Sequence, residues 1–290
     1  MNTINGIEMF FYQDPEMHVK LMATVKEASR ILREERGPDM KVEWKVDARG
    51  RKSSVTSGDL KANTYIMKEL RALNRILHES GHGSFNIISE ENTEQPYEER
   101  AASKYTGSWS VDPLDGTSEY CDLEVQHPNY TCNIGLIVNG EPVYGIVSVP
   151  ETGDVYYGIK GVGAYYVDNE GETHGLKVPE KDYTQPGLLI AVSSRHMNSD
   201  TKKCVQKHFN SPVEVAFSSS LKLLAVAKGD VHAYPRCGPT CEWDTCAADA
   251  VVRAAGGHVY IYDPSKSIQE HTEQLKYNKE DLYNPYFLVL

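Results

Sequence analysis

The chain lacks any run of about 20 apolar residues, the length that a helix needs to cross a bilayer, so we expect no transmembrane segment. Residues 1–6 also lack a basic stretch followed by an apolar one, which a secretory signal would require. Both absences favour a cytoplasmic protein.

Cysteine is scarce as well. Six cysteines among 290 residues, with no Cys-x-x-Cys pair, do not make the disulfide framework of a small secreted domain. Cys237, Cys241 and Cys246 lie close together in the sequence, but no histidine stands at the spacing of a zinc site. We therefore expect reduced and mostly buried thiols.

Basic residues are in the minority, because 30 lysines and arginines stand against 41 aspartates and glutamates, for a net charge of −11. An acidic protein repels a polyanion, and no basic run is long enough to follow a phosphate backbone. This balance excludes nucleic acid as a partner and favours a small-molecule substrate.

At this length a single hydrophobic core seldom keeps growing, so two subdomains packed into one body are expected. The pattern changes from an antiparallel meander to alternating strands and helices near residues 177–185. We place the boundary between an N-terminal α+β part, residues 1–180, and a C-terminal α/β part, residues 181–290.

Apolar periodicity predicts two amphipathic helices, over residues 16–36 and from Asp59 to about Gly81. Asn139-Gly140 between two apolar runs predicts a tight hairpin, and the polar residues 92–107 favour a mobile loop. The strands expected in the first part are 85–89, 108–111, 131–138, 142–149, 154–159 and 163–168. The second part is expected to contain strands 188–193, 213–216, 230–234 and 257–262 and helices 199–209, 219–228 and 244–255.

Three acidic blocks carry the chemistry: Ser89-Glu90-Glu91, Asp112 to Thr117, and Glu242-Trp243-Asp244. Their carboxylates fall at strand ends and helix starts, separated by long apolar stretches. Hard oxygen ligands in such positions suit two or three divalent cations beside an anionic substrate. The blocks therefore predict metal-assisted hydrolysis of a phosphate ester.

The segment Asp112-Pro113-Leu114-Asp115 puts two carboxylates three residues apart on a tight turn. One of them can bridge two cations, and the Leu114 carbonyl can complete a coordination shell. Taken alone, Pro-Leu-Asp-Gly is also ordinary turn chemistry. Phosphatases with a covalent aspartyl nucleophile use an Asp-x-Asp spacing, so the Asp-x-x-Asp spacing favours acids that hold metals, with water as the nucleophile.

The acidic blocks resemble those of the lithium-sensitive, magnesium-dependent phosphatases, which include inositol monophosphatases, fructose-1,6-bisphosphatases and 3'(2'),5'-bisphosphate nucleotidases. The details favour the nucleotidase branch. The segments that are similar to that branch are Asp115 to Tyr120, Ser219 to Lys222 and Tyr234 to Ala248. The similarity extends from about residue 50 to Asn284-Pro285-Tyr286. The positions that depart from the usual residues are Ser54, Gly58 and Ser118.

This resemblance implies an α/β (α+β) fold, a layered αβαβα sandwich. It implies hydrolysis of the 3'-phosphate of adenosine 3',5'-bisphosphate to AMP and phosphate, and acceptance of 3'-phosphoadenylyl sulfate. Two or three Mg²⁺ ions per site and inhibition by Li⁺ are implied with it. The partner is then a small nucleotide bisphosphate, and the chain is a monomer or a homodimer.

The resemblance also implies roles for individual residues. The ligands of the first two magnesium sites would be Glu90, Asp112, the Leu114 carbonyl, Asp115 and Asp244. Glu91 would serve a weaker third site, while Asp59 and Thr117 would orient and deprotonate the attacking water. An N-terminal helix cap is the alternative for Asp59, and a solvated loop acid is the alternative for Glu91.

A substrate-binding set implied by the resemblance overlaps the metal ligands. Its members are Glu90, Leu114, Asp115, Gly116, Thr117, Ser193, His196, Ser218, Lys222, Arg236 and Asp244. A structural or surface salt bridge is the alternative for Arg195 and Arg236. Trp243 and Tyr234 could stack on adenine, although aromatic residues beside a buried strand usually belong to the core.

Two other functions stay open. An inositol phosphate or sugar phosphate phosphatase would use the same scaffold. A catalytically silent nucleotide or metal sensor is the alternative from another class, but it could dispense with Asp59 and Thr117, which are present.

Overall fold

The computed structural model describes residues 15–290 except 47–48, 51, 94 and 103–104. Residues 1–6, which entered the expectation of a missing signal, and parts of the expected loop 92–107 lie outside the described residues. None of the helices in the described part is long and apolar enough to cross a membrane.

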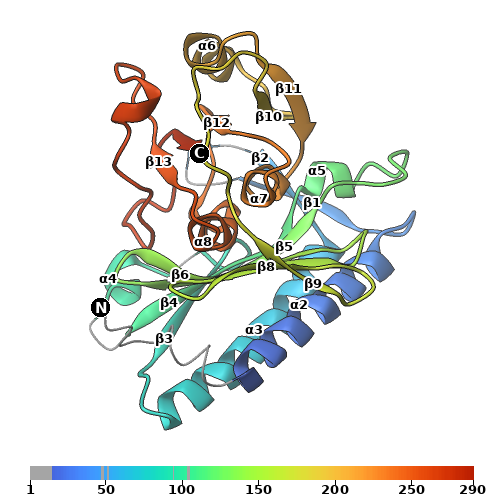
Figure 1. The fold of residues 1–290 in the computed structure, drawn as a ribbon. Coiled ribbons are helices and arrows are strands. Elements are labelled where there is room, and N and C mark those ends of the chain that lie inside the picture. Colours follow the sequence, from blue (N-terminus) through green and yellow to red (C-terminus); the bar gives the residue numbers. More distant parts are fainter. Residues whose placement is uncertain (1–14, 47–48, 51, 94, 103–104) are drawn as a thin grey trace.

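A seven-stranded sheet lies at the centre of the molecule, in the order β3-β4-β5-β6-β7-β8-β9 (Figure 1). Its strands are β3 (Phe85–Ser89), β4 (Gly107–Asp115), β5 (Thr131–Val138), β6 (Glu141–Val149), β7 (Asp154–Ile159), β8 (Gly163–Val167) and β9 (Thr173–Leu176). In this sheet β3 and β4 are parallel and the other neighbours are antiparallel. Asn139 and Gly140 both have positive φ, 52° and 74°, which confirms the predicted hairpin between β5 and β6.

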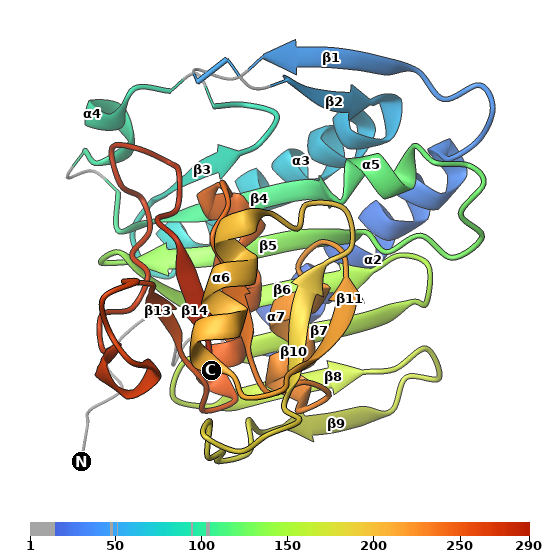
Figure 2. The ribbon, with the colours of Figure 1, turned by 90° about the horizontal axis from the view of Figure 1, so that it is seen from above.

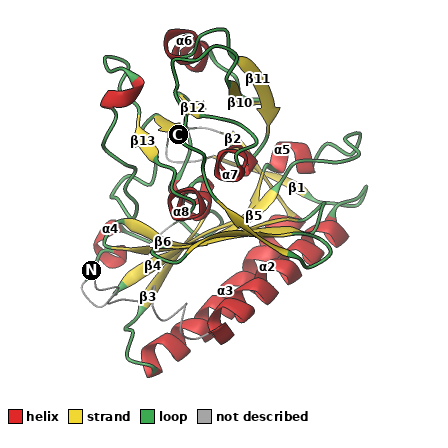
Figure 3. Ribbon diagram, in the orientation of Figure 1, coloured by secondary structure: helices red, strands yellow, loops and turns green. Residues whose placement is uncertain are grey.

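Two long helices, α2 (Pro15–Glu35) and α3 (Ser57–Glu79), cover one face of this sheet (Figure 3). They form because apolar residues recur on one side of each helix, and these side chains are buried together with those of the sheet. Leu21 and Val25 of α2 and Ile66 of α3 belong to this buried cluster. Both helices are confirmed close to their predicted bounds.

The C-terminal part adds α7 and α8 on the opposite face, then small sheets, with α6 outermost (Figure 1). Its elements are β10 (Leu189–Ser193), α6 (Ser199–His208), β11 (Val213–Phe217), α7 (Leu221–Lys228), β12 (Tyr234–Arg236), the 3₁₀ helix η1 (Glu242–Asp244), α8 (Cys246–Ala254), β13 (Val259–Ile261), the 3₁₀ helix η2 (Ile268–Glu270) and β14 (Phe287–Val289). Strands β10 and β11 are parallel, and β12-β14-β13 is antiparallel. The layers thus follow the αβαβα order, and the predicted fold class is confirmed.

A groove of glycines lets α8 lie directly on the large sheet. Gly135, Gly145 and Gly158 stand opposite one another on β5, β6 and β7. A Cβ atom on Gly145 would lie 2.0 Å from the carbonyl oxygen of Ala247, so the helix backbone occupies the space that a side chain would need. Because α8 is seated this closely, η1, which precedes it, is held against β4 and β5.

The two predicted subdomains share buried residues. Val147 of β6 belongs to the same apolar cluster as Leu224 of α7 and Val251 of α8. The boundary near residue 180 stays a prediction. The six cysteines, all within the described part of the chain, form no disulfide, and four of them are buried, as expected.

Two elements are displaced from their predicted bounds. The strand expected at 230–234 overlaps β12 only at Tyr234, and the helix expected to begin at Asp244 begins at Cys246, after η1. Within the segment expected to be a mobile loop, α4 (Tyr97–Arg100) is formed, and its buried Arg100 donates hydrogen bonds to the carbonyls of Lys279 and Glu280. This part of the segment is therefore anchored to the C-terminal region.

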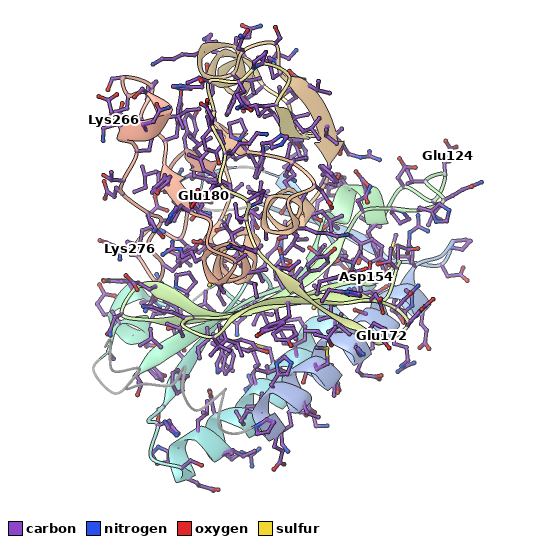
Figure 4. All side chains as sticks on the ribbon, in the orientation of Figure 1. Glu124, Asp154, Glu172, Glu180, Lys266 and Lys276 are labelled. Carbon is purple, nitrogen blue, oxygen red and sulfur yellow. The ribbon has the colours of Figure 1, made fainter. Side chains whose placement is uncertain are left out.

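Three elements of the N-terminal part that contribute residues to the cavity have no counterpart in the sequence prediction. They are β1 (Val42–Val46), β2 (Lys52–Thr56) and α5 (Thr117–Tyr120). Figure 2 shows the β1–β2 hairpin along one edge of the molecule, beside α5. Exposed acidic side chains such as Glu124 and Glu172 lie at the periphery (Figure 4), so part of the net negative charge lies outside the site.

Candidate functional site

A cavity of about 460 Å³ lies at the C-terminal ends of β3 and β4. The predicted site residues that line it are Glu90, Asp112, Leu114, Asp115, Gly116, Thr117, Ser193, His196, Ser218, Lys222, Arg236 and Asp244. Glu90 and Asp112 lie close together because β3 and β4 are parallel. Ser89 is paired with Val111, and the residue after each of these is an acid. Asp59 and Glu91, the other two predicted residues, are not part of the cavity wall.

The end of β4 turns two carboxylates toward this cavity. The pairing of β4 with β5 shifts register between Asp112 and Asp115, as at a β-bulge. The Leu114 N–H donates to Asp112 Oδ1 over 3.0 Å, and Gly116 adopts a φ of 101°, which permits the sharp entry into α5. The segment therefore forms a stable turn, and this turn places both Asp112 and Asp115 in the site.

Four carboxylates of the cavity interact electrostatically with one another. Asp112 is 1% exposed and hydrogen bonds Glu90. Burial raises the pKa of Asp112 well above its usual value, and the charges of Glu90, Asp115 and Asp244 raise it further. Burial also raises the pKa of Asp244 to about 8, with the charges of Asp115 and Glu90 adding to the effect. This part of the wall is a cluster of acids that favours bound protons, or a bound cation, over uncompensated negative charge.

Lys45 of β1 is a site residue that the sequence analysis missed. Its ammonium lies 2.9 Å from Glu90 Oε1 and 2.7 Å from Glu91 Oε1. Burial acts to lower the pKa of Lys45, but the charges of Glu90 and Glu91 outweigh this effect and the pKa is raised. A positive group is therefore held between two of the predicted metal ligands.

The carboxylates are not arranged as a finished metal centre. No group of three or more His, Cys, Asp or Glu side chains within the described residues could hold a metal ion as it stands. Each acid has another partner: Glu90 pairs with Lys45, Asp115 accepts from the Ser220 hydroxyl over 2.9 Å, and Asp244 accepts from the Cys241 N–H over 2.8 Å.

The chemistry of the donor set nevertheless fits Mg²⁺. The available donors are carboxylate oxygens and a backbone carbonyl, the hard ligands that Mg²⁺ prefers. Their buried charge is only partly balanced by the protein, and the Lys45 ammonium already marks a position for a cation beside Glu90. The side chains that would hold the metal are Glu90, Asp112, Asp115 and Asp244.

The two residues expected to act on water have separate partners. Asp59 Oδ2 accepts from the Thr56 N–H over 2.8 Å and from the Thr56 hydroxyl over 2.5 Å, so Asp59 caps α3. Thr117 Oγ1 donates to the Leu114 carbonyl over 3.2 Å. Burial raises the pKa of Asp59 to about 7, against the opposing hydrogen bonds from Thr56, which puts it in the range of a general base at neutral pH.

A cationic wall belongs to the same cavity. Lys222 is buried, and its ammonium donates to the Ser219 carbonyl over 2.6 Å. Arg236 is 9% exposed; one guanidinium nitrogen donates to the Pro239 carbonyl, while the buried Nε has no hydrogen-bond partner. Burial lowers the pKa of His196, and the charges of Arg236 and Lys222 lower it further, so the imidazole is neutral at pH 7. An anion is the natural partner for this wall.

The serines of this wall differ from the prediction in one respect. Ser218 lines the cavity, but its hydroxyl is hydrogen bonded to Glu119 and to Ser194. Ser219, which the sequence analysis did not single out, has a buried Oγ without a partner and a positive φ of 49°. Strain of this kind at a non-glycine residue is typical of functional sites, and Ser219 is the hydroxyl better placed to accept a ligand.

Replacing Lys45 tests how the protein balances charge in this cavity. Lys45→Met is expected to lower the free energy of unfolding of the metal-free protein by about 1–3 kcal/mol, because Glu90 and Glu91 lose their counter-charge. It is also expected to strengthen Mn²⁺ binding about tenfold, since no ammonium competes for Glu90. Denaturant unfolding and titration calorimetry measure the two effects, and Lys41→Met, an exposed lysine just before β1, is the control. An unchanged Mn²⁺ affinity would contradict the competition.

Comparison with known proteins gives a consistent result. The sequence pattern of the inositol monophosphatase family matches residues 14–284. The 3'(2'),5'-bisphosphate nucleotidase CysQ of Salmonella typhimurium is 33% identical over 208 residues, which are 72% of this chain and 76% of that protein. The corresponding enzyme of Aggregatibacter actinomycetemcomitans is 30% identical over 239 residues, 81% of this chain and 79% of that protein. The crystal structure of CysQ from Bacteroides thetaiotaomicron superposes with a TM-score of 0.70 at 28% identity, covering 94% of this chain and 97% of that one.

Proposed function

Because the chain belongs to the inositol monophosphatase family, we propose that it hydrolyses the 3'-phosphate of adenosine 3',5'-bisphosphate, giving AMP and phosphate. The bacterial relatives named as 3'(2'),5'-bisphosphate nucleotidases support this choice within the family. Mg²⁺ is the proposed cofactor, and inhibition by Li⁺ is expected with it.

One observation carries the proposal: a single cavity has an acidic wall and a cationic wall. Asp112 and Asp244 can bind a metal ion that holds the phosphate to be hydrolysed. Lys222 and Arg236 can bind a second phosphate, which is not hydrolysed. An inositol monophosphate or a simple sugar monophosphate has no second anion for the cationic wall. 3'-Phosphoadenylyl sulfate keeps an anionic group at that position, so we expect it to be accepted as well.

The proposed roles of the residues come from the resemblance to the family, since Asp59 and Glu91 do not line the cavity. Mg²⁺ would supply Lewis acidity at the scissile phosphate. Thr117 would orient the attacking water and Asp59 would take its proton, with Glu91 supporting a third cation. Ser193, His196 and Ser218 would line the nucleoside side, with Ser219 beside Lys222.

A side-by-side assay tests the function. The full chain with Mg²⁺ is given adenosine 3',5'-bisphosphate, inositol 1-phosphate and fructose 1,6-bisphosphate, and released phosphate is measured. We expect kcat/KM for the nucleotide to be the highest of the three. A preference for inositol 1-phosphate would overturn the substrate assignment, and nucleotide binding without phosphate release would turn the protein into a sensor.

Lys222 gives a sharper test of the second-phosphate contact. Lys222→Ala is expected to raise KM for adenosine 3',5'-bisphosphate about 10- to 100-fold with a smaller change in kcat, because the lost charge binds ground state and transition state alike. Activity on inositol 1-phosphate should change little. The matched control is Lys228→Ala, at the exposed end of the same helix. Equal losses on both substrates would show that Lys222 supports the fold instead of the second phosphate.

A further inference from the structure

An exposed tryptophan stands at the edge of the active-site cavity. Trp44 lies on β1, is 71% exposed and lines the cavity together with Lys52, Ser53 and Ser54 of β2. Side chains alternate along a strand, so Trp44 and its neighbour Lys45 point to opposite faces of the hairpin. Lys45 contacts Glu90 and Glu91 and thereby ties this hairpin to the carboxylates.

The aromatic residues singled out from the sequence are less suited to hold a ligand. Tyr234 is 2% exposed, packs edge-on against Phe287 at 5.7 Å between ring centroids, and lies beneath the Lys222 ammonium. Trp243 lies on η1 and does not line the cavity in the described part of the chain. Of the aromatic side chains that line the cavity, Trp44 is the most exposed.

The acidic wall, the cationic wall and the edge formed by Trp44 correspond to the three parts of the proposed substrate. The acidic wall takes the scissile phosphate and the cationic wall takes the second phosphate, so the base remains to be placed. A purine offers a flat π-face, and an exposed indole at the cavity edge is the surface on which such a face stacks. The indole would lose much of its contact with water on binding, which favours the complex.

We propose that Trp44 is a specificity-determining residue that stacks on the purine base of the substrate and so distinguishes nucleotides from inositol and sugar phosphates. This inference rests on the proposed function, because it assumes a nucleotide in the cavity. Trp44 contributes affinity for the base and takes no part in the chemistry at the phosphate.

The test compares two ligands that differ by the base. Binding of AMP and of ribose 5-phosphate to the full chain with Mg²⁺ is measured by titration calorimetry for wild type, Trp44→Ala, Trp44→Phe and Val42→Ala. Val42 is the control because it is exposed on the same face of β1 but does not line the cavity. We expect Trp44→Ala to weaken AMP binding about tenfold and to leave ribose 5-phosphate unchanged, whereas Trp44→Phe retains most of the AMP affinity. Val42→Ala should match wild type.

The outcomes separate this inference from the function on which it rests. Equal weakening of both ligands by Trp44→Ala, or no loss of AMP binding, overturns the role of Trp44 while nucleotide hydrolysis by the wild type stands. If the wild type releases no phosphate from adenosine 3',5'-bisphosphate and binds AMP no better than ribose 5-phosphate, the nucleotide assignment and the role of Trp44 both fail.

Discussion

Asp112→Asn is expected to reduce kcat at least about 10³-fold with Mg²⁺ present, while the protein remains folded. Asp112 is 1% exposed, hydrogen bonds Glu90 and lies within the electrostatic reach of Asp115 and Asp244. The amide has nearly the shape of the carboxyl group, and Oδ1 can still accept from the Leu114 N–H. The substitution therefore removes one charge from the acidic wall and little else.

The same substitution has an opposite effect on stability, which makes the test specific. In the metal-free protein Asp112→Asn removes a repelled buried acid, so the free energy of unfolding at pH 8 should rise by about 1–3 kcal/mol. Steady-state phosphate release and denaturant unfolding measure the two quantities on one preparation. Asp200→Asn, an exposed acid on α6, is the control and should change neither. Retained turnover in Asp112→Asn would remove Asp112 from the metal-binding set, and a loss of stability together with activity would indicate a structural role.

The acidic site could be predicted because its geometry is encoded locally. Glu90 directly follows β3 and Asp112 lies in the second half of β4, and parallel pairing of the two strands brings these positions together. The turn residues at Asp115 and Gly116 are visible in the sequence for the same reason, since they act on their immediate neighbours. Local patterns of this kind need no knowledge of the rest of the chain.

The β1–β2 hairpin was not predicted, although Val42, Trp44 and Val46 alternate with polar residues. Val42, Trp44 and Val46 are exposed although they are apolar, and the hairpin pairs with no strand of the large sheet. Such alternation usually marks a strand with one buried face, whereas β1 has no buried face in the structure. Lys45 and Trp44, two residues that we assign to the site, lie in this segment.

Contacts between residues far apart in the sequence determine the features that the sequence did not predict correctly. Arg100 reaches carbonyls 179 and 180 positions later in the chain, and α8 reaches the site because three glycines on separate strands open a groove for it. The start of α8 depends on this packing and on η1, so the sequence placed it two residues too early. Interactions of this kind become visible only when the fold is known.

Metal removal is expected to make the stability of the protein depend steeply on pH. Aspartate has an ordinary pKa near 4, whereas burial, with repulsion from neighbouring acids, raises the pKa of Asp244 to about 8 and that of Asp112 well above its usual value. Between about pH 4 and pH 8 the folded metal-free protein therefore holds protons that the unfolded chain has released. Raising the pH through this window favours unfolding, and the stability present below pH 4 is lost as the pH approaches 8.

Without metal, the free energy of unfolding should thus fall by on the order of 5 kcal/mol between pH 5 and pH 8. With saturating Mg²⁺ the fall should become much smaller, because a cation among Glu90, Asp112, Asp115 and Asp244 stabilises the ionised carboxylates that the metal-free protein disfavours. The contribution of Asp59, whose pKa burial raises to about 7, should remain. Denaturant unfolding at a series of pH values, with EDTA or with Mg²⁺, measures both curves. Asp112→Asn provides the internal comparison, since one of the raised groups is gone and the metal-free slope should be shallower. Buried acids that repel one another must either bind protons or bind a cation. If the metal-free protein is equally stable at pH 5 and pH 8, or if Mg²⁺ leaves the dependence of stability on pH unchanged, these carboxylates do not form the cation site.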